Sequence, residues 1–218
     1  MIKAENIYKS YDNLQVLNGL NLHVKGGQFC MITGPSGTGK STLLNVLSRL
    51  DEFQSGQLYL MGRPVKGMKP TQMAMLRRKY IGFIFQSYNL ISSKNSIENV
   101  SLPLKYNKLK YFARKNMAMV YLEKMGLGDK FYNYPHQLSG GQQQRVAVAR
   151  ALVTKPRILF CDEPTGNLDA DSARLVLEVI FSLRERGSAI VMITHDKSLL
   201  KYDDCRYTLN NGVLTGMQ

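Results

Sequence analysis

The N-terminal part of the chain alternates apolar and polar positions. Residues 1 to about 28 do so in short runs, with a turn at Lys25-Gly-Gly27. Alternation with a period of two is typical of strands that bury one face, so an antiparallel sheet is predicted, and residues 57–60 are predicted to rejoin it. At the other end of the chain, Asn210-Asn-Gly212 predicts the turn of a terminal hairpin.

A second pattern consists of short continuous apolar runs, which predict strands that are buried on both faces. These runs occupy residues 29–32, 80–85, 157–162 and 189–194. Between these runs lie segments whose apolar residues recur at helical spacing. The predicted α/β fold class follows from this alternation of buried strands and helices.

Three helical regions are predicted. Residues 40–50 form an apolar helix, residues from about 88 to 152 are helical, and residues 170–186 form an amphipathic helix opened by Asp171-Ser172 and stopped by Gly187. The apolar face of the first helix is predicted to contain Leu43, Leu44, Val46, Leu47 and Leu50. At 218 residues and 44% hydrophobic composition, the chain can bury an α/β core as one compact unit.

The first chemical motif follows the run 29–32 and has the form G-x-x-x-x-G-K-[ST], which is typical of a phosphate cradle. Its predicted ligand-binding residues are Gly34, Pro35, Ser36, Gly37, Thr38, Gly39, Lys40, Ser41 and Thr42. The glycines allow backbone N–H groups to point at phosphate oxygens, and the following helix presents its positive end to the anion. Lys40 is expected to reach the β- and γ-phosphates, and Ser41 to ligate Mg²⁺.

A second motif lies at the end of the run 157–162, where Asp162 and Glu163 follow each other. A buried strand would carry Asp162 to the edge of the sheet where ligands gather. Asp162 is expected to hold Mg²⁺, and Glu163 to orient and deprotonate an attacking water. An acidic pair that merely ends a strand or caps a helix is the alternative interpretation.

The third motif, Leu138-Ser-Gly-Gly-Gln142, is a glycine-rich loop that leads into a helix. Ser139 and the N–H groups of this loop would form a second anion site, because they lie at a helix N-terminus. The cradle already supplies such a site, so the loop has no role in most proteins of that kind.

Together these motifs resemble the ATPase subunit of ABC transporters over nearly the whole chain. The resemblance implies a P-loop NTPase with a RecA-like core, an N-terminal antiparallel β subdomain and an inserted helical subdomain. It implies a single ATPase domain over 1–218, in which 1–87 and 153–218 form the nucleotide-binding core and 88–152 the helical subdomain with the signature loop.

The same resemblance assigns further residues to ATP. Tyr11 would stack on adenine with Val16 covering the base, Gln86 would contact Mg²⁺ and the attacking water, and His195 would contact the γ-phosphate. Asn167-Leu-Asp169 matches a loop that communicates between protomers. Each side chain also has a simpler interpretation. Tyr11 could be a half-buried strand residue, Gln86 a surface residue, His195 a polar strand end, and Asp169 a helix N-cap.

The resemblance also implies a partner for the third motif. The signature residues would cover the γ-phosphate of the opposite chain's ATP, so that a second copy, or a homologous ATPase subunit, closes head to tail around two nucleotides. The residues concerned are Ser139, Gly140, Gly141 and Gln142.

Three stretches narrow the resemblance to the lipoprotein-releasing and macrolide-exporter group, namely 76–86, 142–152 and 162–169. The chain departs from the group's pattern at Cys161 and at residues 92–95. The second departure lies near the surface that faces the permease, which leaves the transported substrate open.

Charge and hydropathy bear on the partners. No apolar stretch approaches the ~18 residues of a membrane span, and the N-terminus lacks a signal-peptide pattern. A separate integral-membrane permease is therefore expected, with the ATPase at the cytoplasmic face of the membrane. The formal net charge is +13, and Lys105–Lys115 interleaves basic and aromatic residues. This segment is interpreted as a solvated face or as a surface near anionic lipid or a permease, and nucleic acid is the least favoured ligand.

The function expected from the sequence is ATP hydrolysis coupled to transport through that permease. An ABC ATPase that regulates a membrane protein, as in the cell-division relative, would share every catalytic residue. A soluble ABC ATPase that acts on DNA or ribosomes is less favoured, because long coiled coils and a second cassette are missing from the sequence. A small-molecule kinase would leave the signature loop without a role.

Overall fold

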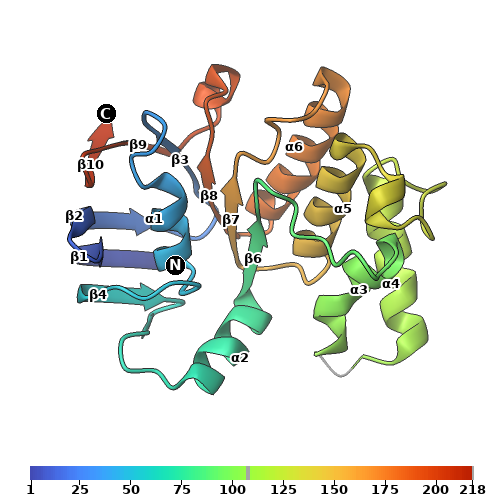
Figure 1. Cartoon of the computed structure of the whole chain (residues 1–218), viewed down its shortest axis with the longest axis horizontal. Coiled ribbons are helices and arrows are strands. Elements are labelled where there is room, and N and C mark those ends of the chain that lie inside the picture. The colour runs from blue at the N-terminus through green and yellow to red at the C-terminus, as the bar shows by residue number, and fades with distance from the viewer. Residues whose placement is uncertain (107–108, 218) are drawn as a thin grey trace.

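The computed structural model describes residues 1–106 and 109–217, and its strands form two sheets (Figure 1). The four-stranded sheet is antiparallel, as predicted. Its order is β2 (Leu14–Val24), β1 (Ile2–Tyr11), β4 (Ser55–Leu60), β5 (Arg63–Pro64). The pairing of β4 with β1 confirms that residues 57–60 rejoin the N-terminal sheet.

The six-stranded sheet has a parallel centre. Its order is β10 (Val213–Met217), β9 (Cys205–Asn210), β3 (Phe29–Thr33), β8 (Ala189–Ile193), β7 (Ile158–Asp162), β6 (Ile81–Ile84). Strands β9, β3, β8, β7 and β6 pair in parallel, and β10 pairs antiparallel with β9. The terminal hairpin is confirmed: Asn211 and Gly212 both have positive φ, as a two-residue turn of type I′ requires.

Two hydrophobic cores share the parallel sheet, which explains why its strands are continuously apolar. Cys30, Phe160 and Val191 face a core that contains the antiparallel sheet and α1 (Lys40–Leu47). Phe29, Leu159 and Ile190, from alternate positions, face a core with the helices on the other side. These helices are α3 (Ser96–Lys105), α4 (Tyr111–Lys124), α5 (Gly140–Leu152) and α6 (Ala170–Glu185). The parallel sheet is therefore the middle layer, with α1 and the antiparallel sheet on one face and the four helices on the other.

Several helix boundaries differ from the prediction. The first helix ends at Leu47 instead of residue 50, because Arg49 turns the chain with φ 58°, and Leu50 is 48% exposed. The assignment of Leu50 to the apolar face was wrong. The last helix begins after Asp169, whose carboxylate accepts a hydrogen bond from the Ser172 N–H at 2.9 Å. It is therefore opened by Asp169 and not by Asp171-Ser172.

The region 88–152 is only partly helical. Residues 88–95 and much of 125–139 are irregular apart from the short 3₁₀ helix η1 (Pro135–Gln137). A helix that was not predicted, α2 (Pro70–Tyr80), precedes β6, and a 3₁₀ helix, η2 (Lys197–Lys201), follows β8. In α2 only Met73 and Leu76 are buried, so the segment carries little hydrophobic periodicity.

Candidate functional site

The phosphate cradle connects β3 to α1, as the motif requires. Gly34 and Gly39 have φ values of 146° and 92°. Their contacts also exclude a side chain, because a Cβ would lie 2.4 Å from the Leu209 carbonyl oxygen at Gly34 and 2.5 Å from Val16 at Gly39. The N-cap position of α1 has no side-chain cap, and its first turn has no acidic residue. Its first N–H groups can therefore bind an anion.

Lys40 is positioned by the cradle itself. Its ammonium donates hydrogen bonds to the carbonyl oxygens of Gly34 at 2.9 Å and Pro35 at 2.6 Å. Thr38 also donates to the Pro35 carbonyl, at 2.9 Å. The positive charge is thus held at the loop, where it complements a phosphate group.

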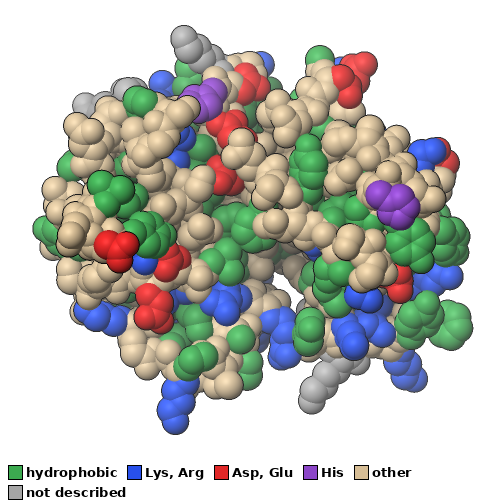
Figure 2. Space-filling model, viewed as in Figure 1, with side chains coloured by type: hydrophobic (Ala, Val, Ile, Leu, Met, Phe, Trp, Pro, Cys, Tyr) green, Lys and Arg blue, Asp and Glu red, His purple; other side chains and the backbone are tan. Residues whose placement is uncertain are grey.

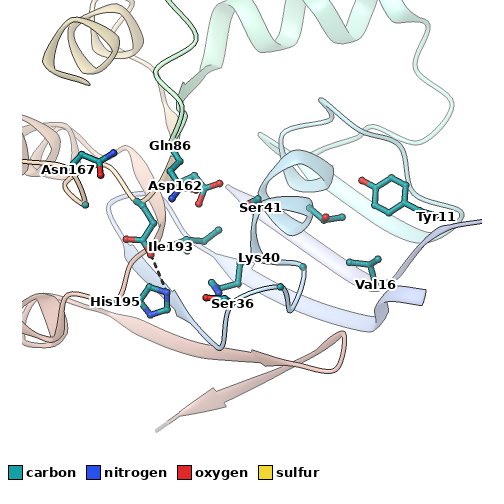
Figure 3. Close-up of a pocket in the computed structure, with 15 residues that line it drawn as sticks. Tyr11, Val16, Ser36, Lys40, Ser41, Gln86, Asp162, Asn167, Ile193 and His195 are labelled. Atoms are coloured by element: carbon teal, nitrogen blue, oxygen red, sulfur yellow. Dashed lines mark ion pairs between the residues drawn. The ribbon is translucent and has the colours of Figure 1, made fainter. Parts of the chain in front are cut away.

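A cavity of about 620 Å³ lies against this cradle, a size suited to a nucleotide (Figure 3). Twelve of the predicted site residues line it: Tyr11, Val16, Ser36, Gly37, Gly39, Lys40, Ser41, Thr42, Gln86, Asp162, Glu163 and His195. Gly34, Pro35 and Thr38 shape the loop without lining the cavity. Of the remaining lining residues, Asn167 belongs to the predicted loop Asn167-Leu-Asp169, whereas Gly166 and Ile193 were not predicted.

The acidic end of the cavity joins the ends of β7 and β8. Asp162 is 8% exposed, and Glu163 follows it with φ 47°. Such a left-handed conformation is costly for a glutamate. It is held here by the hydrogen bond from the Glu163 N–H to the Ile193 carbonyl oxygen, at 3.0 Å. His195 Nε2 lies 3.4 Å from Glu163 Oε1, as the dashed line in Figure 3 marks.

The environment of Glu163 favours its role as a proton acceptor. Burial raises the pKa of the Glu163 carboxyl above its ordinary value of 4.5, and the neighbouring charge of Asp162 acts in the same direction. His195 opposes this shift in pKa. A carboxylate with a raised pKa is a stronger base than an exposed one, and Glu163 lines the same cavity as Lys40.

Tyr11 lies at the opposite end of the cavity and is held by two residues that sequence reasoning missed. Its hydroxyl donates to the Asp51 carboxylate, and the Lys9 ammonium lies 4.3 Å from the centre of its ring. Lys9 also donates to Asp51 Oδ1 at 2.9 Å and is only 6% exposed. The hydrogen bond to Asp51 raises the pKa of Tyr11. The ring is therefore held by Lys9 and Asp51 and still borders the cavity.

The signature loop lies apart from this cavity. Ser139 is the N-cap of α5: its hydroxyl accepts from the Gln142 N–H at 3.3 Å, and its own N–H donates to Gln142 Oε1 at 3.0 Å. Ser139 and Gly140 are exposed, Gly141 and Gln142 are half-buried, and none of the four lines the cavity. The loop is thus a preformed helix N-terminus on the surface. Asp169 likewise lies outside the cavity, as the N-cap of α6.

Tyr88 connects the segment after Gln86 with the signature loop and with the Asn167 loop. The sequence does not reveal this connection. Its hydroxyl accepts a hydrogen bond from Asn167 Nδ2 at 3.3 Å and lies against Gly140, where a Cβ would be 3.1 Å away. Tyr88 and Asn89 both have positive φ. Arg150 holds them by donating to their carbonyl oxygens at 2.8 and 2.6 Å. The segment after Gln86 is therefore tied to the signature loop and to the Asn167 loop.

Comparison with known proteins gives the family. The sequence model of the ABC transporter family matches residues 17–166. The chain belongs to the ABC transporter ATPases. It is 46% identical to the ABC transporter ATP-binding protein MJ1508 of Methanocaldococcus jannaschii over 97% of this chain and 96% of that protein. With the lipoprotein-releasing system ATP-binding protein LolD of Aquifex aeolicus it shares 41% identity over 99% and 96% of the two chains.

Two further comparisons concern a fused relative and a solved structure. The macrolide export ATP-binding/permease protein MacB of Campylobacter fetus is 44% identical over 97% of this chain, which covers only 34% of MacB. The ATP-binding cassette MJ0796, solved as a dimer in a post-hydrolysis state with ADP and Pi, superposes with a TM-score of 0.95 at 35% identity, over 100% of this chain and 98% of that one. This ABC transporter ATPase accordingly has the P-loop ABC fold, and it binds and hydrolyses ATP.

Proposed function

We propose that this ABC transporter ATPase drives a separate integral-membrane permease of the lipoprotein-release or macrolide-export type. In this proposal two copies close head to tail around two ATP molecules. The observation that carries the proposal is the division of the site. The cradle and the acidic pair line one cavity, whereas Ser139 presents a second helix N-terminus on a different surface of the same chain.

Within each cavity the proposal gives each lining side chain the role that the family resemblance implies. Lys40 binds the β- and γ-phosphates, and Tyr11 with Val16 covers the adenine. Glu163 takes a proton from the attacking water, which Gln86 orients, and His195 contacts the γ-phosphate. The raised pKa of Glu163 supports its role as the base.

The residues present also fit Mg²⁺. Ser41, Gln86 and Asp162 bring oxygen donors to the cavity, which is the ligand type that Mg²⁺ prefers. In the described part of the chain, no group of three or more His, Cys, Asp or Glu side chains is placed to hold a metal ion. The nucleotide's phosphates and water would complete the coordination. Bound there, Mg²⁺ would neutralise charge on the phosphates.

Closure of the dimer would bring the signature residues to the γ-phosphate of the partner's ATP. The Ser139 hydroxyl and the N–H groups in the first turn of α5 that the cap does not use offer donors that suit an anion. The solved structures of MJ0796 are dimeric, which supports the use of two copies. Loss of the γ-phosphate would remove the contacts that favour the closed state, so hydrolysis would let the two copies separate.

A groove on the lower edge of the molecule is suited to the permease. It has a volume of about 430 Å³ and an apolar floor that includes Phe83, Phe85 and Pro103, with Arg78 and Arg150 among its lining residues. Figure 2 shows a hollow there, bordered by Lys and Arg side chains. Among the residues described, no helix has the length and apolarity of a bilayer-spanning segment. Attachment through this groove would place the ATPase at the cytoplasmic face of the membrane.

The test uses Glu163→Gln, which keeps the shape of the side chain and removes the base. With ATP and Mg²⁺ this variant is expected to keep its nucleotide affinity, to lose at least about 100-fold in turnover, and to elute as a dimer in size-exclusion chromatography. Adding Ser139→Arg should return it to a monomer that still binds ATP. Ser93→Arg, at another exposed serine, is the matched control and should leave the dimer intact.

A monomer of Glu163→Gln under these conditions would contradict the head-to-tail arrangement. So would Ser139→Arg in the unmodified background if it hydrolysed ATP at the normal rate. Co-purification of a membrane protein with the tagged ATPase then tests the permease separately.

A further inference from the structure

The end of α3 and the first turn of α4 carry large aromatic side chains that the protein itself does not bury. Tyr106 is 58% exposed, Tyr111 64% and Phe112 77%. The basic residues Lys105 and Lys110 beside them are exposed as well. The term aromatic tip is used below for Lys105, Tyr106, Lys110, Tyr111, Phe112, Arg114 and Lys115.

The aromatic tip carries positive charge, and no acidic residue in its part of the sequence compensates that charge. Between Glu98 and Glu123 the sequence contains five Lys or Arg residues and no Asp or Glu. Four of the five belong to the tip, and the fifth, Lys108, lies outside the described residues. The segment therefore complements an anionic surface.

A solvated helix face accounts for the lysines but not for the aromatic rings. The opposite side of α4 is packed in the core through Ala118, Tyr121 and Leu122. Tyr111 and Phe112, in contrast, contact each other edge to face, with ring centres 5.8 Å apart, and the Arg114 guanidinium lies 5.8 Å from the Tyr111 ring. Exposed clusters of this kind mark surfaces that contact a partner.

The surroundings of the tip indicate which partner. The tip lies at the same edge of the molecule as α2, whose last turn is the basic run Arg77-Arg78-Lys79 (Figure 1). Figure 2 shows Lys and Arg side chains along this edge, over α2 and the α3–α4 region, with hydrophobic side chains among them. Tyr106 also lines the groove proposed for the permease. The edge that would face the membrane is thus the basic and aromatic one.

We propose that the aromatic tip rests on the anionic headgroups of the membrane leaflet next to the permease. Tyr and Phe rings are suited to the depth of the headgroups, where one side is apolar and the other wet, and Lys and Arg gain from the negative surface potential. A groove tracking a nucleic-acid strand fits less well, because the 430 Å³ groove contains Tyr106 but neither Tyr111 nor Phe112. The proposal rests on the membrane-side location argued under the proposed function.

The experiment measures binding of the purified ATPase to vesicles of phosphatidylcholine containing roughly one third phosphatidylglycerol, at low and high salt. One variant removes three charges of the tip (Lys105→Gln, Lys110→Gln, Lys115→Gln). A second removes the rings (Tyr111→Ser, Phe112→Ser). The control removes three positive charges elsewhere (Lys25→Gln, Arg174→Gln, Lys201→Gln).

Each basic side chain near an anionic surface is worth about fivefold in binding, so the charge variant should bind on the order of 100-fold more weakly. The ring variant should lose about tenfold, and the control should bind like the unmodified protein. High salt should weaken binding of the unmodified protein by a larger factor than binding of the charge variant.

Equal losses in the control and charge variants would overturn the proposal, since they would indicate attraction by net charge alone. Unchanged vesicle binding in both tip variants would overturn it as well. If those variants instead lost binding to a single-stranded oligonucleotide or to the permease, the tip would be a binding surface for that partner, and the proposal would be overturned. ATP hydrolysis by the tip variants in solution should be normal, so that failure here is distinguishable from the loss of turnover expected of Glu163→Gln.

Discussion

The partly buried ion pair between Lys9 and Asp51 allows a quantitative test of what holds Tyr11 at its end of the cavity. Lys9→Met removes the ammonium and keeps the length of the side chain, so that the packing of its stem is retained. In the folded protein this ammonium donates to Asp51 Oδ1 at 2.9 Å and lies over the Tyr11 ring at 4.3 Å. The substitution therefore leaves Asp51 with the Tyr11 hydroxyl but without its cation.

The expected loss follows from how far each partner is buried. Removing one member of a fully buried ion pair costs about 3–5 kcal/mol, whereas an exposed pair is worth about 0–1 kcal/mol. The Lys9 side chain is 8% exposed and that of Asp51 is 29% exposed, so an intermediate loss of about 2 kcal/mol is expected. Asp51→Asn should cost at least as much, because it leaves the more deeply buried charge unpaired. The double variant should cost less than the sum of the two.

The pH dependence provides an independent check. Burial by itself would raise the pKa of Asp51, but the hydrogen bonds from Tyr11 and Lys9 outweigh it and lower the pKa below the ordinary value of 3.8. A carboxyl whose pKa is lower in the folded state stabilises the fold above its unfolded pKa, and this stabilisation is lost as the pH falls through the folded value. The difference between the unmodified protein and Lys9→Met should therefore be largest near neutral pH and shrink below about pH 4.

Urea unfolding at a series of pH values measures both effects, with Lys3→Met as the control, since the Lys3–Glu5 pair is exposed. A loss smaller than about 0.5 kcal/mol for Lys9→Met would refute the reasoning, because that is the magnitude of an exposed pair. A difference between the two proteins that stayed constant into the acid range would refute the assignment to Asp51.

Two further predictions concern turnover. Because burial raises the pKa of Glu163, the acid limb of the pH–rate profile should have its midpoint above 4.5. His195→Gln should move this midpoint higher, because His195 and Lys40 both oppose the shift and the substitution removes the first of them. An unchanged midpoint would argue against Glu163 as the titrating base. Tyr88→Phe removes only the hydroxyl that accepts from Asn167. It should lower kcat by roughly threefold to tenfold and weaken the cooperativity of the ATP dependence, with thermal stability unchanged. Normal cooperativity in Tyr88→Phe, measured beside Tyr132→Phe as a control at an exposed tyrosine, would show that the contact with Asn167 does not couple the loops.

The elements that the sequence predicted are those specified by neighbouring residues. A strand buried on both faces requires consecutive apolar side chains, and the cradle requires its glycines and Lys40 within eight positions, so β3 and the loop after it could be recognised directly. The turn at Asn211-Gly212 is local in the same way. Helix α2 could not be recognised, because only two of its side chains reach the core and its pattern is mostly polar.

The contacts that were missed join residues that are distant in the sequence. Lys9 and Asp51 are 42 positions apart, and Arg150 lies 61 and 62 positions from the carbonyl groups that it holds. Neither a buried lysine nor a pair of left-handed residues has a signature in a single sequence, because both are stabilised by tertiary contacts. Only the folded structure shows that Lys9 and Asp51 hold Tyr11 in place, and that Arg150 holds the segment after Gln86.

The position of the signature loop shows why a chain of this kind would act as a pair. Ser139 is specified by its own capping hydrogen bonds with Gln142, so its anion site is formed without any ligand or partner. The same chain's cavity is closed by a different helix N-terminus, that of α1, and does not include Ser139. If both sites bind one triphosphate, they must come from two copies. Tyr88 then becomes important, because it contacts Gly140 in the signature loop and Asn167 at its own cavity. In the proposed dimer, a change beside one nucleotide would alter, through this side chain, the surface presented to the other.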